Sequence, residues 1–591
     1  MRIQTSLLHA LVLILAYSLN AAPISELIVV DQLGYRPASD KWFMIAVPVT
    51  GQNAGQGRPP ASEVQIRRTS DLAVVQSISL QRWSNGAVHS SSGDRVWQGE
   101  FSNLRIPGTY HVFDPANNVQ SFDFDIREDA YNSILTASTK SYYYQRSGTA
   151  ITPEYGEQWT HGPAHIANQL ASRMFDNSLG GIQPESTALD ITGGWYDAGD
   201  YRKYTSWMAE IIWDLGTAYE WWPSVFGDQS GIPESGNGIP DLLDEARNEV
   251  DFWLALRDGE GYSHGVTNPD GDGTMYQADA TSCAAWASAA NAAMLASCLA
   301  LAGLDELADS YTASALEAWR VGSLYPADEL DRFQHTGING MLFRDFRMTA
   351  ASFLWDLTGQ EDFERIVRET ALISAGIEEV QVKGRDQIWA TAGYLFSRRR
   401  PGDGAFASRL RAVAIAAGRS QAAAVADDPS RRSSDPMLLY FHTGQNVDRI
   451  IVAHALLAAD PSAADPSAAG PELVAGPGLQ AELLDGQAVN QWLRHRLDGE
   501  LVVDVAECVE VAFGAHDGGG PQVGVDVGQR RNVRGILPVR DLAAVLGEGV
   551  ERFPERGSDV NVVHSVHFTD VVTVSRTWVR GARCGGGRSW R

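Results

Sequence analysis

The spacing of hydrophobic residues divides the chain into a strand-rich part followed by a helix-rich part. Residues 26 to about 127 contain short runs of β-branched and aromatic residues, such as Glu26–Val30 and Trp42–Val47, separated by turn signals rich in Gly, Pro and Asn. About one hundred residues of short strands and turns are typical of a β-sandwich. The pattern therefore predicts a β-sandwich of the immunoglobulin-like kind over residues 23–128.

From about Asp129 the hydrophobic period becomes that of helices. Between Asp241 and Leu254 apolar residues recur at three- and four-residue intervals, which indicates a helix with one buried face. Pro240 and the acidic residues after it are helix-start signals. Further helical segments are expected near 279–303, 305–319, 347–358, 361–375, 404–425 and 446–459. Many helices with long loops favour an all-α barrel over residues 129–459, with a cleft at one end.

The composition changes again at about Asp460. Two copies of Ala-Ala-Asp-Pro-Ser follow each other over residues 458–467, and no Tyr, Lys or Met occurs from Pro461 to the C-terminus. The same stretch is rich in Val and Gly and lacks a helical period after about residue 485. We expect an atypical, low-order tail over 460–591 that arises from a shifted reading frame in GC-rich DNA. This would leave the barrel incomplete at its C-terminal end. A second β module or a flexible extension is the alternative.

Charge and the N-terminal residues narrow the classes of function. The chain has 47 Lys and Arg against 73 Asp and Glu, which gives a net charge of −26. Phosphate-bearing partners require basic patches, so we expect no nucleic-acid and no membrane partner. Arg2, an apolar run over residues 7–16 and small residues up to Ala22 predict a signal peptide over residues 1–22. The alternative is a buried N-terminal helix. We expect a secreted or periplasmic monomer.

The strongest chemical signal is the segment Gly193–Tyr204, which reads GGWYDAGDYRKY. Asp197 and Asp200 stand three residues apart in a Gly- and aromatic-rich loop, and a helical pattern follows. We expect the positive end of the helix dipole to favour their ionised forms. An ionised carboxylate can hold and deprotonate a water molecule. The alternative is that one of the two aspartates only caps the helix.

Aromatic residues flank the two aspartates. Trp195, Tyr196 and Tyr201 belong to the same segment, and their rings offer flat faces for sugar rings. We therefore predict that these three residues bind substrate.

This segment resembles the signature of glycoside hydrolase family 9, the inverting cellulases. Asn237–Leu254 resembles the next stretch of that family, and the strand-rich part resembles the immunoglobulin-like domain that often precedes its catalytic domain. The resemblance covers residues 26–459. It implies an (α/α)6 barrel that hydrolyses β-1,4-glucan or a related β-glycan. It also implies that Asp200 is the general base and that Asp197 helps it to hold the attacking water.

The sequence lacks a recognisable counterpart of the family's general acid. An inverting glycosidase needs a second carboxyl group that protonates the leaving oxygen. The family's acid is a Glu near the C-terminus with Asn and aromatic neighbours, and no such motif is found. The glutamates of the tail that we considered lie in Val-, Gly- or Arg-rich surroundings, and they are Glu507, Glu510, Glu548, Glu551 and Glu555. The alternatives are therefore a non-catalytic glycan-binding protein and a related hydrolase of chitosan oligomers or xyloglucan.

No cofactor and no metal are expected. Many relatives with the β module carry a structural zinc bound by Cys and His ahead of the aspartate segment. Here Ser147 and Ala164 stand where the cysteines would be, and His161 and His165 remain. Two imidazoles do not make a closed structural zinc site, which requires four ligands.

Overall fold

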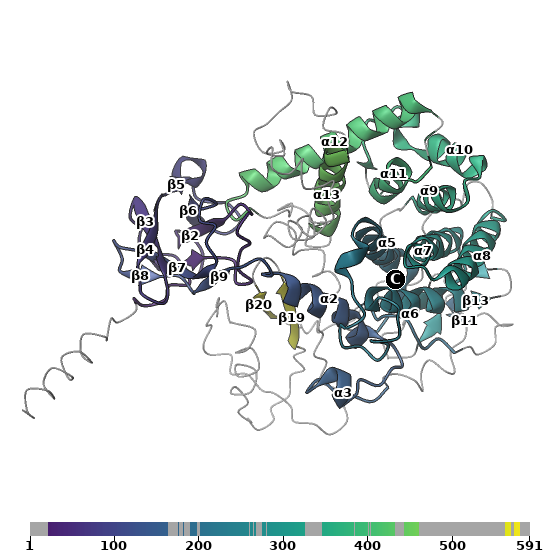
Figure 1. Cartoon of the computed structure of the whole chain (residues 1–591), viewed down its shortest axis with the longest axis horizontal. Helices are drawn as coiled ribbons and strands as arrows, with labels where there is room; N and C mark the ends of the chain where they lie inside the picture. The colour runs from purple at the N-terminus through teal and green to yellow at the C-terminus, as the bar shows by residue number, and fades with distance from the viewer. Residues whose placement is uncertain are drawn as a thin grey trace, which may run out of the picture. The chain divides into compact units, whose positions relative to one another are not determined.

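The chain folds into two units that divide between Tyr131 and Asn132 (Figure 1). The computed structural model describes most residues from Ala22 to Ala459 and two later strands. The described residues are 22–163, 175–176, 181–182, 190–197, 201–258, 261–263, 265–267, 275–278, 280–325, 345–382, 385–399, 401, 403–431, 443–459, 562–568 and 572–578.

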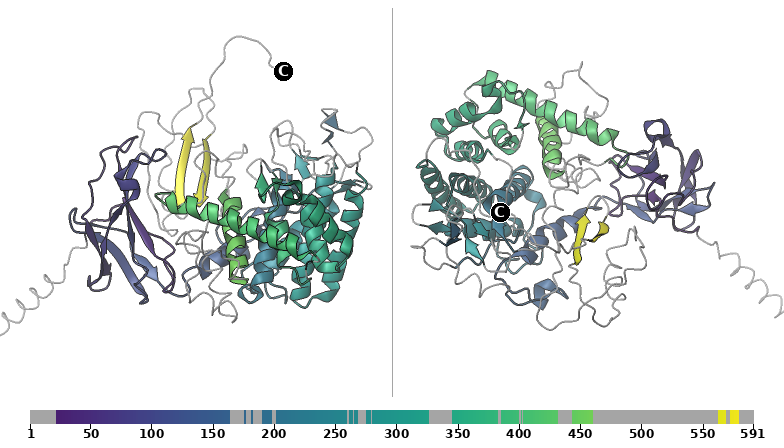
Figure 2. Two further views of the ribbon diagram at one scale, coloured as in Figure 1. Left: turned by 90° about the horizontal axis from the view of Figure 1, so that it is seen from above. Right: turned by 180° about the vertical axis from the view of Figure 1, so that it is seen from behind.

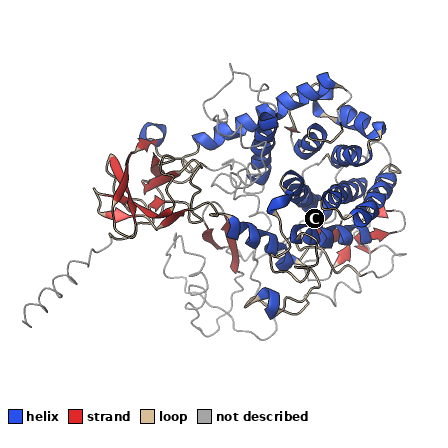
Figure 3. Ribbon diagram, viewed as in Figure 1, coloured by secondary structure: helices blue, strands red, loops and turns tan. Residues whose placement is uncertain are grey.

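The first unit consists of two antiparallel sheets, whose strands are red in Figure 3. One sheet has the order β1-β2-β6-β5, formed by Ile28–Val29, Trp42–Pro48, Asp94–Glu100 and Gln81–Arg82. The other has the order β4-β3-β7-β8, formed by Val74–Ser79, Glu63–Arg68, Gly108–Asp114 and Val119–Gln120. β9 (Phe124–Ile126) also pairs with β7. This arrangement confirms the predicted N-terminal β-sandwich.

Alternation along the strands supplies the core of the sandwich. In β2, Phe43 and Ile45 are buried while their neighbours are partly exposed, which is the period-2 pattern of a half-buried strand. The ring of Tyr35 lies edge-on to Phe101 and Phe124, with centroids 5.0 and 5.3 Å away. An aromatic cluster of this geometry stabilises the unit beyond the area that it buries.

The second unit is built of helices, which are blue in Figure 3. Its main helices are α2 (Asn132–Gln145), α5 (Thr205–Trp221), α6 (Asp241–Ala255), α7 (Ser282–Leu301), α8 (Asp305–Gly322), α9 (Phe346–Thr358), α10 (Glu361–Thr370), α11 (Ile388–Leu395), α12 (Gly404–Asp427) and α13 (Thr443–Ala459). In the inner group, α5 packs against α7, α7 against α9, and α9 against α11. Outside these four helices lie α8, α10 and α12 (Figure 1). Alternation of inner and outer helices is the arrangement expected of an α/α barrel.

The sequence signals at the start of α6 are confirmed. The helix begins at Asp241 directly after Pro240, and Asp241 and Asp244 lie in its first turn. Carboxylates near a helix N-terminus are favoured by the helix dipole. The predicted apolar face is buried, as Leu242, Val250 and other residues of the stripe show.

α7 is the most deeply buried helix of the inner group, and nearly all of its residues are buried. Its length and its mean hydropathy of 1.4 would allow it to cross a membrane, but 89% of that window lies inside the protein, as in a core helix. Two glycines allow the neighbouring helices to pack closely against α7. A Cβ on Gly216 of α5 would lie 2.2 Å from Met294 Cγ, and one on Gly322 of α8 would lie 2.8 Å from the ring of Trp286.

Short strands complete the helical unit. They are β10 (Phe175–Asp176), β11 (Gly181–Ile182), β12 (Lys203–Tyr204), β13 (Arg257–Asp258), β14 (Gly261–Tyr262), β15 (Gly265–Thr267), β16 (Tyr276–Gln277), β17 (Gln381–Val382) and β18 (Arg385–Asp386). Near the C-terminus, β19 (Val562–Phe568) pairs antiparallel with β20 (Val572–Trp578), and both are yellow in Figure 2. The rest of the predicted tail lies outside the described residues.

Candidate active site

The aspartate segment ends in a short strand, β12, that the sequence pattern did not predict. β12 pairs Lys203 with Val266 and Tyr204 with Gly265, and α5 begins at the next residue, Thr205. This strand separates Asp197 from the helix, and the effect of a helix dipole falls off within the first turn. The expected stabilisation of Asp197 by the dipole of α5 therefore has no support in the structure.

Main-chain hydrogen bonds tie the segment to the C-terminal end of α2. Ser147 N donates to Gly194 O at 2.8 Å, and Gly193 N donates to Ser147 O at 3.2 Å. Tyr196 N donates to Gln145 O at 2.9 Å. The backbone ahead of Asp197 is therefore fixed by a helix end that precedes it by about fifty residues of chain.

A main-chain hydrogen bond links Asp197 to Arg202. The backbone N–H of Asp197 donates to Arg202 O at 2.9 Å, so these two residues lie side by side. Tyr201, just before Arg202, has φ of +61°, in the left-handed region that turns require. The side chain of Asp197 is half-buried. Asp200 lies between Asp197 and Arg202 in the sequence, but residues 198–200 lie outside the described part of the chain.

The prediction that Trp195 binds substrate is wrong. Its side chain is 1% exposed, and its ring lies against Tyr142 of α2 with centroids 4.5 Å apart. The indole Nε1 points to Glu245 Oε2 at 3.4 Å. The ring therefore has no free face for a sugar and belongs to the core beneath the loop.

Tyr196 and Tyr201 differ from Trp195 because both are only half-buried. Their rings lie edge-to-face, with centroids 5.3 Å apart and planes at 75°. The two tyrosines flank Asp197 in the sequence. They remain predicted sugar-contacting residues.

Beneath the segment, Glu249 of α6 receives two hydrogen bonds. Trp195 N donates to its Oε2 at 2.6 Å, and Trp253 Nε1 donates to its Oε1 at 2.7 Å. Glu249 is fully buried. Burial raises the pKa of Glu249 to about 8, while the two hydrogen bonds and the nearby Lys203 act to lower it.

Lys203 of β12 is also fully buried, and it holds the residues just before Trp195. Its Nζ donates to Ile191 O at 2.6 Å, to Gly193 O at 2.8 Å and to Ser147 Oγ at 3.1 Å. Two carbonyls and a hydroxyl suit the three N–H donors of an ammonium group. Burial lowers the pKa of Lys203 to about 7, against the attraction of nearby carboxylates.

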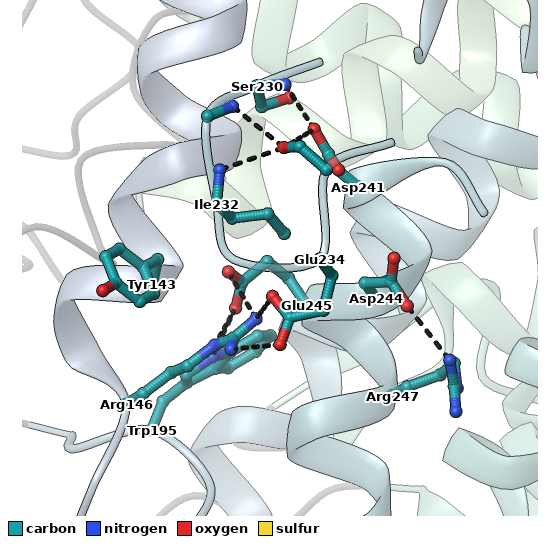
Figure 4. Close-up of polar contacts among 12 residues, drawn as sticks. Tyr143, Arg146, Trp195, Ser230, Ile232, Glu234, Asp241, Asp244, Glu245 and Arg247 are labelled. Carbon is teal, nitrogen blue, oxygen red and sulfur yellow. Dashed lines mark hydrogen bonds and ion pairs between the residues drawn. The ribbon is translucent and has the colours of Figure 1, made fainter. Parts of the chain in front are cut away.

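Arg146, next in the chain after α2, joins two carboxylates below the segment (Figure 4). Its Nε and Nη2 donate to Glu245 at 3.1 and 2.9 Å, and its Nη1 and Nη2 donate to Glu234 at 2.8 and 3.0 Å. Bidentate contacts of this kind are among the strong hydrogen bonds of proteins. Burial raises the pKa of Glu245 to about 7, and Arg146 opposes that shift.

These supporting residues were missed by the sequence analysis. Glu245 and Glu249 are four residues apart on the face of α6 that also carries Leu242 and Trp253. Carboxylates on the buried face of a helix are unusual unless they have partners. That placement was an available signal for a buried polar network, although it does not identify the partners.

The structure describes only some of the residues considered as metal ligands or as the general acid. Within the described ranges no group of three or more His, Cys, Asp or Glu side chains is arranged to hold a metal ion. Ser147, at a position where relatives would carry a Cys ligand, bonds Lys203 instead. His165 and the glutamates of the tail lie outside the described residues.

Comparison with known proteins agrees with the two-unit fold. The family "Glycosyl hydrolase family 9" matches residues 131–460, and "Cellulase N-terminal ig-like domain" matches residues 25–117. A metagenome-derived family 9 endoglucanase of known structure superposes with a TM-score of 0.58 at 24% identity, over 83% of this chain and 85% of its own. A Bacteroides ovatus family 9 structure gives 0.60 at 20% identity, over 82% and 85%.

Curated relatives match over shorter stretches. The "Xyloglucan-specific endo-beta-1,4-glucanase BoGH9A" of Bacteroides ovatus is 32% identical over 183 residues, which is 30% of each chain. "Endoglucanase D" of Acetivibrio thermocellus is 28% identical over 292 residues, 46% of this chain and 45% of its own. This chain thus spans less than half the length of either relative. Since the family 9 match covers more than half of the 591 residues, the chain belongs to glycosyl hydrolase family 9.

Proposed function

We propose that this chain hydrolyses β-1,4-glucan or a related β-glycan with inversion at the anomeric carbon. Asp200 is the general base, and Asp197 helps to hold the attacking water. The observation that carries the proposal is the hydrogen bond from Asp197 N to Arg202 O, in a segment anchored to α2 within a family 9 chain. A water-activating carboxylate must keep one direction, and an anchored backbone supports this.

In the proposed reaction the base removes a proton from water as the water attacks the sugar from the face opposite the leaving group. A general acid, ~6.5–9.5 Å from the base, protonates the leaving oxygen. Tyr196 and Tyr201, half-buried beside Asp197, are the proposed contacts for the sugar rings. The sequence identifies no general acid. The residues assigned here therefore account for activation of the water and not for protonation of the leaving oxygen.

The substrate panel follows from the relatives. One matched relative is named as specific for xyloglucan, and another as an endoglucanase. The first name specifies a β-1,4-glucanase and the second an endoglucanase, which supports a β-glucan as the substrate class. Chitosan oligomers are the cationic alternative that the net charge of −26 leaves open.

We also propose that the protein is exported and monomeric, and that it binds a β-glycan but neither nucleic acid nor membrane. The support is the signal-like pattern over residues 1–22 and the acidic composition, which disfavours nucleic acid and anionic membranes. Sequencing the N-terminus of the mature protein and measuring its mass in solution would test both points.

Reducing-end release by the purified chain from carboxymethylcellulose, lichenan, xyloglucan and chitosan tests the proposed activity. In an active version of the enzyme, Asp200→Asn should lower turnover by orders of magnitude while binding survives, since the water then lacks a base. Asp197→Ala should also cripple turnover through a misplaced water. Near-normal turnover of Asp200→Asn would overturn the assignment.

The missing acid favours one other function, that of a glycan-binding protein without catalysis. Such a protein would keep the cleft and would bind cellulose without releasing reducing ends. Cellulose pull-down, run beside the turnover assay, separates the two functions. Binding with no release from any of the four substrates would favour the non-catalytic one.

A further inference from the structure

The N–H groups of the aspartate segment have identified acceptors at four positions. Gly193, Tyr196 and Asp197 donate to the main-chain carbonyls of Ser147, Gln145 and Arg202. Trp195 donates to the carboxylate of Glu249. Three of the four acceptors are therefore backbone atoms, whereas the fourth belongs to a side chain that substitution can remove.

The contact between Trp195 and Glu249 spans two distant parts of the chain. Trp195 stands two residues before Asp197, and Glu249 lies in the middle of α6, whose flanking residues are packed in the core. At 2.6 Å the hydrogen bond from Trp195 N to Glu249 Oε2 is short. It fixes the backbone at Trp195 relative to a rigid helix.

A carboxylate is suited to this position because it serves two donors at once. The backbone N–H of Trp195 and the indole N–H of Trp253 can only donate, and each is bonded to a different oxygen of Glu249. An amide has one acceptor oxygen, and an apolar side chain has none. A glutamate in the core is unfavourable unless it is fully hydrogen-bonded, so its two filled acceptor sites account for its presence here.

We propose that Glu249 is a positioning residue for the backbone that carries Asp197. It holds the backbone N–H of Trp195 and thereby sets the direction of Asp197, without touching the substrate. The inference rests on the proposed function for its effect on turnover, but not for its effect on the order of the loop. Displacement of a catalytic group by about 1 Å can lower the rate about 100-fold.

The test is a cycle of variants at Glu249 and Trp253. In Glu249→Gln one oxygen becomes an NH2 group, so either Trp195 or Trp253 faces a second donor. We expect kcat to fall about 10- to 100-fold, because the carboxylate of Asp197 is no longer held in one direction. Adding Trp253→Phe removes the competing donor and frees the amide oxygen for Trp195. The loss of kcat relative to Trp253→Phe alone should then be much smaller.

A spectroscopic reading makes the test independent of activity. With 15N-labelled Trp, the Trp195 amide is assigned by its absence in Trp195→Phe. We expect a signal that is slow to exchange with solvent in the wild type, exchange-broadened in Glu249→Gln, and restored in the double variant. The dispersion of the other Trp signals shows in each case whether the protein is folded.

The outcomes separate the two proposals. If the wild type has no turnover, the proposed function fails, and the Trp195 signal alone decides the role of Glu249. Additive losses in the cycle, or a Trp195 amide that is unchanged in Glu249→Gln, would overturn the inference. Lower thermal stability with unchanged kcat would reduce Glu249 to a structural residue.

Discussion

Arg146 and Glu245 form a bidentate ion pair inside the helical unit. Arg146 Nε lies 3.1 Å from Oε2 of Glu245, and Nη2 lies 2.9 Å from Oε1. The two side chains are 5% and 0% exposed. Glu245 Oε2 also accepts from the indole of Trp195, so the pair underlies the aspartate segment. Removing Arg146 would leave Glu245 inside the protein without its guanidinium partner.

Arg146→Met should therefore lower the free energy of unfolding by about 3–5 kcal/mol, as breaking a buried ion pair does. Urea denaturation measures the loss. Arg365→Met is the matched control, because Arg365 pairs with Asp362 and Glu369 on the exposed side of α10. That variant should change stability far less. Equal effects at the two arginines would contradict the prediction, and Arg146→Met combined with Glu245→Leu should recover part of the loss.

Gly194→Ala should disturb the same region through backbone strain and a steric clash. Gly194 has φ of +67°, and a Cβ there would lie 2.4 Å from Cδ1 of Phe252 and 3.0 Å from Oε2 of Glu249. Gly238→Ala is the control, since φ is +89° but nothing lies within 4 Å. The control should lose about 1–2 kcal/mol from the left-handed backbone alone. Gly194→Ala should lose more, measured as the drop in melting temperature of each variant.

Stability should fall as pH rises from about 5 to 7. Glu220 of α5 accepts a hydrogen bond from Ser297 of α7, and burial raises the pKa of Glu220 to about 7. Below that pH the folded chain keeps a proton that the unfolded chain releases above pH ~4.3. The resulting stabilisation is present at low pH and is lost as pH rises through about 7. Glu245 and Glu249 act in the same direction.

Melting temperatures between pH 5 and 7 check this dependence. Glu220→Gln should flatten the curve, because the amide does not titrate. Lys203, whose pKa burial lowers to about 7, adds stability only as pH rises above that value, so it does not affect the interval. A wild-type melting temperature that rises from pH 5 to 7 would contradict the assignment of raised pKa values to these glutamates.

The coding DNA should contain an insertion or deletion near codon 460. The family 9 match ends at residue 460, within the first copy of the repeated pentapeptide. The chain as it stands should be weakly active at most, since the leaving oxygen departs without an acid that is typically worth 10²–10⁴-fold. Restoring the frame should recover that factor in kcat. Resequencing that verifies the present frame would refute the prediction.

The amphipathic helix α6 was predictable from its period, and the short buried helix α11 was not. α6 agrees with the expected segment to within a residue or two, because its apolar residues recur on one face. α11 was missed. Its residues Ile388, Trp389 and Ala392 are all buried, and a short helix enclosed on most sides has no polar stripe to reveal its period.

The candidate site was predictable only where its signal is local. The signal of the aspartate segment is contained in twelve consecutive residues, whereas the hydrogen-bonded residues Arg146 and Glu245 lie 99 positions apart in the sequence. No local pattern encodes such a contact. Trp195 was misjudged for the same reason, since an aromatic residue in a glycine-rich loop can face solvent or core. The packing of Tyr142 against the Trp195 ring shows that this ring faces the core.

The complete burial of α7 determines how the barrel can change during evolution. Its alanines meet neighbours on every side, and Gly216 and Gly322 already mark the closest approaches. In a saturation library, tolerance along α7 should be uniformly low, with no repeat of 3.6 residues. Along α10, where Phe363 and Val367 face inward and Arg365 faces solvent, tolerance should rise and fall with each turn. Neutral drift should therefore be slower along α7 than along α10.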